Sequence, residues 1–191
     1  IYVRASVPGV YEGYVKGTQA LTIEKRPVTA TGEGWDEDQP YTGSEYKKEG
    51  WSFGEKEIAE NQTGTITYVI VGTEVGPYTG TFSNFKVMSG DEEVTDNYAL
   101  TENAGKLNIV ESPIAGYVTL TPANASKIYD GTPLAAAAAT AEDTNGKSVK
   151  IEYSVDENNW TEDPNTITAT AVADSKTIYV RASVPGVYEG Y

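Results

Sequence analysis

The stretch IYVRASVPGVYEGY occupies residues 1–14 and recurs without a single change as residues 178–191. Its first seven residues alternate apolar and polar side chains, which is typical of a β-strand with one buried face, and Pro8-Gly9 supplies a turn. Chance does not produce a perfect fourteen-residue match. We therefore predict that the parent polypeptide is a tandem array of nearly identical 177-residue units, of which this sequence is one unit with an overlap.

A weaker similarity divides the unit into two halves. In the first half the strand-like Val28-Thr29-Ala30-Thr31 precedes Tyr41-Thr42-Gly43, and in the second half Val118-Thr119-Leu120-Thr121 precedes Tyr129-Asp130-Gly131. The two intervals differ by only two residues. We interpret the halves as diverged copies of one ancestral domain, a first-type and a second-type module.

The closing strands of the modules set the expected domain boundaries. LTIEKR at 21–26 and KLNIVE at 106–111 both alternate like strands and each ends a half. Residues 1–26 are then the C-terminal strands of a preceding second-type module. Residues 27–112 form a complete first-type module, and residues 113–191 form a second-type module that lacks its last strand.

Strand signals dominate the rest of the sequence. β-Branched and aromatic residues alternate with polar ones at TITYVIV 65–71, KIEYSV 150–155 and TIYVRA 177–182. Turn dipeptides separate the strands, with Asn145-Gly146 as a candidate hairpin. The short spacing predicts an all-β chain of tandem antiparallel β-sandwich or β-grasp-like modules, arranged end to end.

Two stretches favour a helix by composition. LAAAAATA at 134–141 has the highest intrinsic helix propensity in the chain, but it lacks a terminating cap and an amphipathic stripe. We expect a strand there, with one short helical turn as the alternative. GEKEIAE at 54–60 is a second candidate for a single helical turn.

Composition excludes several function classes. The chain has no histidine and no cysteine, so common catalytic bases, thiolate nucleophiles, disulfides and zinc-thiolate sites are missing. A formal net charge of −14 opposes binding to nucleic acid. No window of eighteen residues is apolar enough to insert into a membrane.

Carboxylates are plentiful, but none has the spacing of a known site. The clusters are Asp36-Glu37-Asp38, Asp91-Glu92-Glu93 and Glu162-Asp163. We interpret them as solvated acidic loops, with calcium binding as the alternative. We assign no catalytic, cofactor-binding or metal-binding residue, and we predict that the protein is not an enzyme and uses no cofactor.

Several motifs resemble known bacterial surface repeats. Tyr129-Asp130-Gly131-Thr132-Pro133-Leu134, the Val-Thr-x-Thr opening strands, Thr95-Asp96-Asn97-Tyr98 and the closing LNIVE strand together resemble the MBG and YDG families. Tyr153-Ser154-Val155-Asp156 followed by Trp160 is similar to bacterial immunoglobulin-like repeats. The first half departs from the pattern, because Thr42 stands where the aspartate of the YDG box is expected. The resemblance implies an extracellular location at the cell surface, on large adhesin-like proteins with domains in tandem.

The YDG box itself is expected to support the fold. Asp130 can bond the backbone two residues further on, Gly131 can adopt a positive φ, and Tyr129 can bury its ring while its hydroxyl finds a partner.

Three functions are compatible with this sequence. We expect a structural spacer, stalk or extracellular fibre segment, whose partners are adjacent copies of the repeat in cis or in a fibre. One alternative is an adhesive module that binds a host or microbial glycan or protein, with Trp35, Trp51 and Trp160 as candidate stacking residues. The other is a filament subunit that assembles by β-strand complementation between copies. The sequence contains the residue types of a lysine-to-asparagine amide crosslink, but it does not place one.

Overall fold

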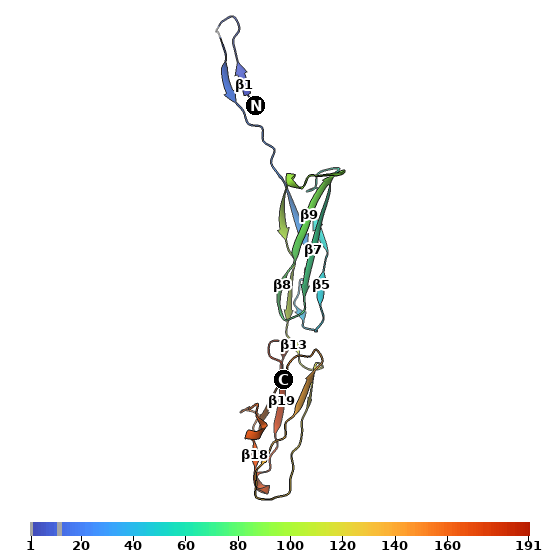
Figure 1. Cartoon of the computed structure of the whole chain (residues 1–191), viewed down its shortest axis with the longest axis vertical. Helices are drawn as coiled ribbons and strands as arrows, with labels where there is room; N and C mark the ends of the chain where they lie inside the picture. Colours follow the sequence, from blue (N-terminus) through green and yellow to red (C-terminus); the bar gives the residue numbers. More distant parts are fainter. Residues whose placement is uncertain (1, 11–12) are drawn as a thin grey trace. The chain divides into compact units, whose positions relative to one another are not determined.

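The computed structural model describes residues 2–10 and 13–191 (Figure 1). Its regular elements are β-strands and three single turns of 3-10 helix, so the prediction of an all-β chain is confirmed. The turns are η1 (Thr95–Asn97), η2 (Pro164–Thr166) and η3 (Val172–Asp174). None of the helices in the described part of the chain has the length and apolar character needed to cross a bilayer.

The chain divides into two compact units. Unit 1 comprises residues 1–32, 51–68 and 82–103, and unit 2 comprises residues 33–50, 69–81 and 104–191. This division cuts across the predicted module 27–112. The boundaries of the repeat modules stay a prediction.

Unit 1 contains a hairpin and a three-stranded sheet. In the hairpin, β1 (Tyr2–Ala5) pairs antiparallel with β2 (Val15–Thr18). In the sheet, β3 (Arg26–Gly32) lies between β11 (Tyr98–Asn103), which runs parallel to it, and β6 (Trp51–Phe53), which runs antiparallel.

The core of unit 1 forms around the ring of Tyr98. Val28 and Val87 are fully buried beside it, and Phe53 and Leu100 pack against this cluster. The Tyr98 hydroxyl donates to Gln62 Oε1 at 2.6 Å, so the buried phenol has a hydrogen-bond partner.

One four-stranded sheet has the order β10-β9-β7-β5. Its strands are β5 (Tyr46–Lys48), β7 (Thr63–Gly72), β9 (Thr81–Ser89) and β10 (Glu92–Glu93). The predicted strand 65–71 is therefore confirmed as the centre of β7. Its period-two pattern holds, because Ile66, Tyr68 and Ile70 are buried while the residues between them are more exposed.

Unit 2 contains a second three-stranded sheet. The predicted closing strand 106–111 is confirmed as β12 (Lys106–Val110), which buries Leu107 and Ile109. It lies between β4 (Gln39–Pro40) and β8 (Gly76–Thr79).

The rest of unit 2 is built from four pairs of strands. They are β13 (Ser112–Pro113) with β20 (Tyr188–Glu189), β14 (Val118–Thr121) with β16 (Thr140–Asp143), β15 (Leu134–Ala135) with β18 (Thr168–Ala169), and β17 (Lys150–Ser154) with β19 (Tyr179–Ser183). The predicted strands 150–155 and 177–182 correspond to β17 and β19.

The expectation of purely antiparallel sheets is wrong. Three pairs are parallel, namely β3 with β11, β4 with β12, and β13 with β20. Parallel neighbours need a long connection. Here the connections are long runs of chain that contain further strands instead of crossover helices.

Four local expectations also need correction. Residues 21–25 of the predicted strand 21–26 have no strand partner, and β3 begins only at Arg26. Within 134–141, only the two ends form strands, and no helical turn is present. Residues 54–60 form a non-helical turn, in which Lys56 has a φ of 58°. Asn145-Gly146 forms a turn but no hairpin, because β16 pairs with β14.

Candidate functional site

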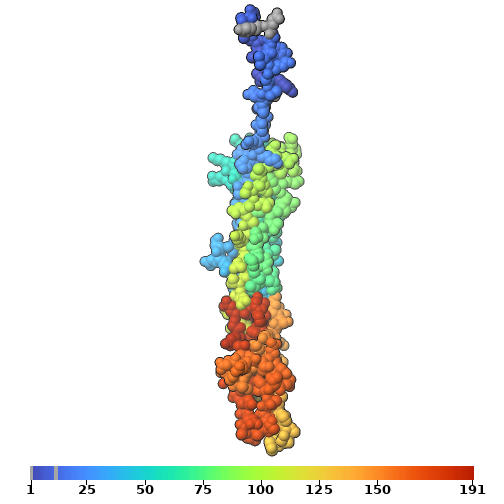
Figure 2. Space-filling model, turned by 90° about the vertical axis from the view of Figure 1, so that its left-hand side faces the viewer, coloured from blue at the N-terminus to red at the C-terminus, as the bar shows by residue number. Residues whose placement is uncertain are grey.

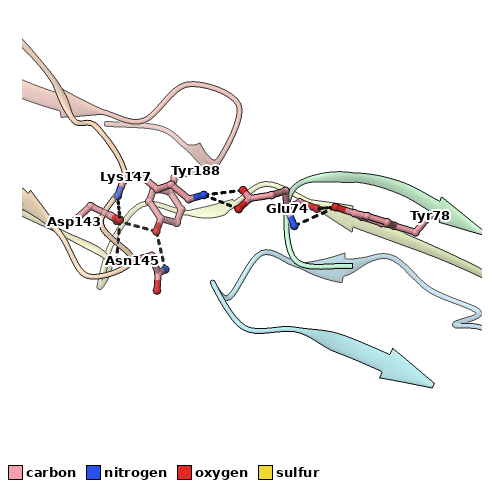
Figure 3. A network of polar contacts seen from close by, with 6 residues as sticks. All are labelled: Glu74, Tyr78, Asp143, Asn145, Lys147 and Tyr188. Carbon is pink, nitrogen blue, oxygen red and sulfur yellow. Dashed lines mark hydrogen bonds and ion pairs between the residues drawn. The ribbon is translucent and has the colours of Figure 1, made fainter. Parts of the chain in front are cut away.

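A network of polar contacts in unit 2 surrounds the ring of Tyr188 on β20 (Figure 3). A tight turn presents this residue, because the N–H of Tyr188 donates to the carbonyl of Val184 at 3.1 Å. The pairing of β20 with β13 then fixes the strand. Only 3% of Tyr188 is exposed. We call Glu74, Asp143, Asn145, Lys147 and Tyr188 the Tyr188 network.

Two aromatic rings pack on Tyr188. Tyr117 stacks on it with ring centroids 4.9 Å apart and planes 15° apart, and Tyr41 meets it edge-on at 5.7 Å. Tyr41 is itself held by the backbone, since its N–H donates to the Val110 carbonyl and its own carbonyl accepts from the Ser112 hydroxyl, both at 2.8 Å. The three rings therefore form a packed, anchored cluster.

Asp143 collects hydrogen bonds from three directions. The Tyr188 hydroxyl donates to Oδ1 at 2.8 Å, and the backbone N–H groups of Asn145 and Lys147 donate to Oδ2 at 2.9 and 2.8 Å. Burial alone would raise the pKa of the Asp143 carboxyl. The donors from Lys147 and Tyr188 outweigh burial and hold this pKa below its ordinary value.

Lys147 connects the turn around Asp143 to the loop that precedes β8. Its Nζ lies 2.8 and 2.7 Å from the two carboxylate oxygens of Glu74 and 5.5 Å from the centroid of the Tyr41 ring. The backbone of Glu74 is fixed in turn by the Tyr78 hydroxyl, which donates to its carbonyl and accepts from its N–H. Glu74 is the main cause that raises the pKa of Lys147, although burial opposes it.

The energy of the site comes mainly from ring burial. The side chain of Glu74 is 59% exposed, and an ion pair with such an exposed partner contributes at most about 1 kcal/mol. Fully burying one aromatic ring contributes roughly 1.5–3 kcal/mol. The tyrosines thus set the strength of the contact, and the polar groups set its geometry.

The Tyr188 network is a structural contact, in which the polar side chains bind one another. The Tyr188 hydroxyl both donates to Asp143 and accepts from Asn145 Nδ2 at 3.0 Å, so the phenol is occupied in both roles. Among the described residues, no buried side-chain nitrogen or oxygen lacks a hydrogen-bond partner. The side chains at the centre of the network therefore bind one another.

Comparison with known proteins gives no relative. No family model, curated protein or solved structure matches this chain.

The structure confirms the predicted turn of the YDG box but not the predicted burial of its tyrosine. The Asp130 carboxylate accepts from the Thr132 N–H at 2.9 Å and Gly131 has a φ of 77°, as predicted. The expected burial of Tyr129 is wrong, because the residue is 67% exposed. The described residues provide no strand that covers its ring. The corresponding Tyr41 of the first half is buried, because it packs on Tyr188.

The three tryptophans are half-buried and lie in intramolecular ring contacts. Trp35 meets Tyr46 edge-on at 6.1 Å, Trp51 meets Phe53 at 5.0 Å, and Arg181 lies 4.1 Å from the ring centroid of Trp160. These contacts occupy ring surface that a sugar would need. In the part of the chain that the structure describes, no group of three or more acidic side chains is placed to hold a metal ion.

Sequence reasoning missed the Tyr188 network. Asn145-Gly146 was singled out only as a hairpin turn, and Tyr188 only as part of the repeated segment. The usable signal was Asp143, whose spacing to Asn145 is that of an Asx turn. The contact between Lys147 and Glu74 spans 73 residues and leaves no local pattern.

The network makes the stability of unit 2 sensitive to alkaline pH. Burial raises the pKa of Tyr188 to about 12, from an ordinary value of 10.0. A raised folded-state pKa means that the stabilisation is complete below pH 10.0 and is lost as the pH rises towards 12. The raised pKa of Lys147 acts in the same direction at higher pH. We expect the unfolding temperature of unit 2 to fall steeply across this window.

Thermal unfolding of Tyr188→Phe tests this expectation. The variant cannot ionise at this position, so its unfolding temperature should fall less steeply with pH than that of the wild type. Tyr191→Phe, which changes an exposed tyrosine, is the matched control and should follow the wild type. Identical pH dependence in Tyr188→Phe and the wild type would contradict the assignment.

Proposed function

We propose that this chain is a segment of an extracellular stalk or fibre on a bacterial surface, built from tandem units of 177 residues. The single observation that carries the proposal is the unchanged fourteen-residue segment at positions 1–14 and 178–191. An enzyme gains little from such repetition, whereas a spacer gains length from every copy. The function is therefore reach and mechanical continuity.

The arrangement of unit 2 supports this proposal. Tyr41 and Glu74 belong to the predicted first-type module, and Asp143, Lys147 and Tyr188 belong to the predicted second-type module. The ring cluster and the Lys147–Glu74 pair thus tie residues of the two predicted modules into one compact unit. A stalk needs such a contact, because a flexible linker between modules would not transmit force or hold a direction.

The finer architecture belongs to the same proposal. We propose that each unit contains two β modules of sandwich or β-grasp-like type, placed end to end, as the resemblance to MBG, YDG and immunoglobulin-like repeats implies. The ten residues of β7 extend over about 33 Å at the usual strand rise. Modules one strand tall give an axial period of roughly 70–90 Å for a two-module unit.

Electron microscopy of the native protein, released from the cell surface, tests the function. We expect filaments or stalks with a regular axial period of roughly 70–90 Å. A chain with a shortened array, produced by deleting whole units, should give shorter stalks with the same period. A short native product, in which the fourteen-residue segment occurs without further units, would overturn the proposal.

A further inference from the structure

The turn at Asn145-Gly146 combines two residue types that can react with each other. The backbone nitrogen that follows an asparagine can attack the carbonyl carbon of the asparagine side chain, because the two atoms close a succinimide ring. Glycine hinders this attack least, since it has no side chain beside the attacking nitrogen. Asn145-Gly146 is the one Asn-Gly pair of the sequence. The most easily modified amide of the chain therefore lies in the Tyr188 network.

The backbone of this turn is held in place by Asp143. The N–H of Gly146, whose nitrogen is the attacking atom, donates to the Asp143 carbonyl at 3.1 Å. The Asp143 carboxylate accepts from the N–H groups of Asn145 and Lys147, which lie on either side of Gly146. Gly146 has a φ of 72°, which favours glycine at this position. The attacking nitrogen is thus fixed within a hydrogen-bonded turn.

The amide of Asn145 is held on two sides. Its Nδ2 donates to the Tyr188 hydroxyl at 3.0 Å. Its Oδ1 lies over the backbone of Gly43, so closely that a Cβ at Gly43 would be 2.3 Å from this oxygen. Ring closure expels Nδ2 and turns the carbonyl carbon towards Gly146. The reaction therefore requires the amide to leave the Tyr188 hydroxyl.

The reacting residues lie at the surface, beside a buried ring. Asn145 and Gly146 are exposed, whereas Tyr188 is only 3% exposed. Figure 2 shows red atoms of the C-terminal segment, which contains Tyr188, against orange atoms of unit 2. Water can therefore reach the turn without entering the ring cluster.

We propose that Asn145-Gly146 is a site of spontaneous deamidation, which is protected while the Tyr188 network is closed and reacts when the network opens. The Gly146 nitrogen forms a bond to Cγ of Asn145 and gives up its proton, and the bond from Cγ to Nδ2 breaks to release ammonia. Water then opens the succinimide at either carbonyl. The product is aspartate or isoaspartate at position 145.

This product disrupts the network. The Tyr188 hydroxyl gives its single proton to Asp143, so it needs the N–H of the Asn145 amide as a donor. A carboxylate at position 145 offers no such donor, and two negative groups then face one phenol. Isoaspartate also lengthens the backbone inside the turn that Asp143 holds. Deamidation therefore prevents the opened contact from closing again.

The inference goes beyond the proposed function. The Tyr188 network joins residues of the two predicted modules, so each opening of this contact gives Asn145 an opportunity to react. The extent of deamidation then reports how often the contact has opened. The tests use the chain by itself, and their failure would leave the axial period of the native fibre, which tests the proposed function, unaffected.

Peptide mass spectrometry tests the protection. The chain is incubated in mildly alkaline buffer, with and without urea, and deamidation at Asn145 is followed over time. We expect the rate in the folded chain to be roughly tenfold lower or less, because ring closure waits for local opening. Asn124, which is exposed and precedes an alanine, should react much more slowly than Asn145 in urea. Equal rates at Asn145 in the folded and unfolded chain would overturn the proposal.

Two matched variants test the role of the hydroxyl. Tyr188→Phe removes only the partner of the amide, so deamidation at Asn145 in the folded chain should accelerate roughly threefold to tenfold. Tyr153→Phe makes the same change at another buried tyrosine of unit 2, whose hydroxyl accepts from the Ala139 N–H at 2.8 Å. This control should keep the wild-type rate. Equal rates in the two variants would overturn the assignment, because the reaction would then follow the stability of the whole unit.

The consequence of the reaction is tested with Asn145→Asp. This variant carries the product, so its urea midpoint for unit 2 should lie below that of the wild type. Asn124→Asp adds the same charge at an exposed position and should keep the wild-type midpoint. If Asn145→Asp is as stable as Asn124→Asp, deamidation does not weaken the Tyr188 network and this part of the proposal is wrong.

Discussion

Tyr188→Ala is expected to lower the free energy of unfolding of unit 2 by about 3–5 kcal/mol. The substitution empties a ring site that is 97% buried between Tyr117 and Tyr41. It also removes a hydrogen-bond donor from the Asp143 carboxylate. Both effects act on the residues that hold the two predicted modules in one unit.

Urea unfolding followed by tryptophan fluorescence measures this change. A Trp51→Phe background leaves Trp35 and Trp160, both in unit 2, as the reporters. Tyr188→Phe retains the ring and should cost only about 1–2 kcal/mol, and Tyr191→Ala, at an exposed position, should stay within about 0.5 kcal/mol of the parent. A Tyr188→Ala variant as stable as the Tyr191→Ala control would show that the ring cluster does not hold unit 2 together.

The strands could be predicted wherever a local pattern decides the structure. In β7 and β12 the alternation of side chains determines which face is buried, so residues 65–71 and 106–111 were correctly assigned. The turn at Asp130-Gly131 was equally predictable, because an Asx turn and a positive φ depend on neighbouring residues. These features need no information about distant parts of the chain.

Features that depend on distant partners could not be predicted. Residues 21–25 have the alternation of a strand but are not paired, because a strand exists only beside another strand. Tyr129 has the same motif position as Tyr41, yet only Tyr41 has a neighbouring Tyr188 to pack against. The parallel pairing of β3 with β11 joins residues more than 70 positions apart. The alternation of side chains along one strand does not indicate which distant strand will pair with it.

Ile109→Ala and Ile23→Ala should differ widely in effect although both change the same Leu-x-Ile motif. Ile109 is 1% exposed in β12, and its truncation is expected to cost about 2–5 kcal/mol through lost burial and a cavity. Ile23 is 94% exposed, so Ile23→Ala should change the stability of the chain by less than about 0.5 kcal/mol. Urea unfolding of the two variants under the same conditions provides the comparison.

Equal losses of stability in Ile109→Ala and Ile23→Ala would contradict this prediction, because the two isoleucines would then contribute the same burial despite exposed fractions of 1% and 94%. A large loss in Ile109→Ala alone would show that the same Leu-x-Ile motif stabilises the protein only where neighbouring strands cover it.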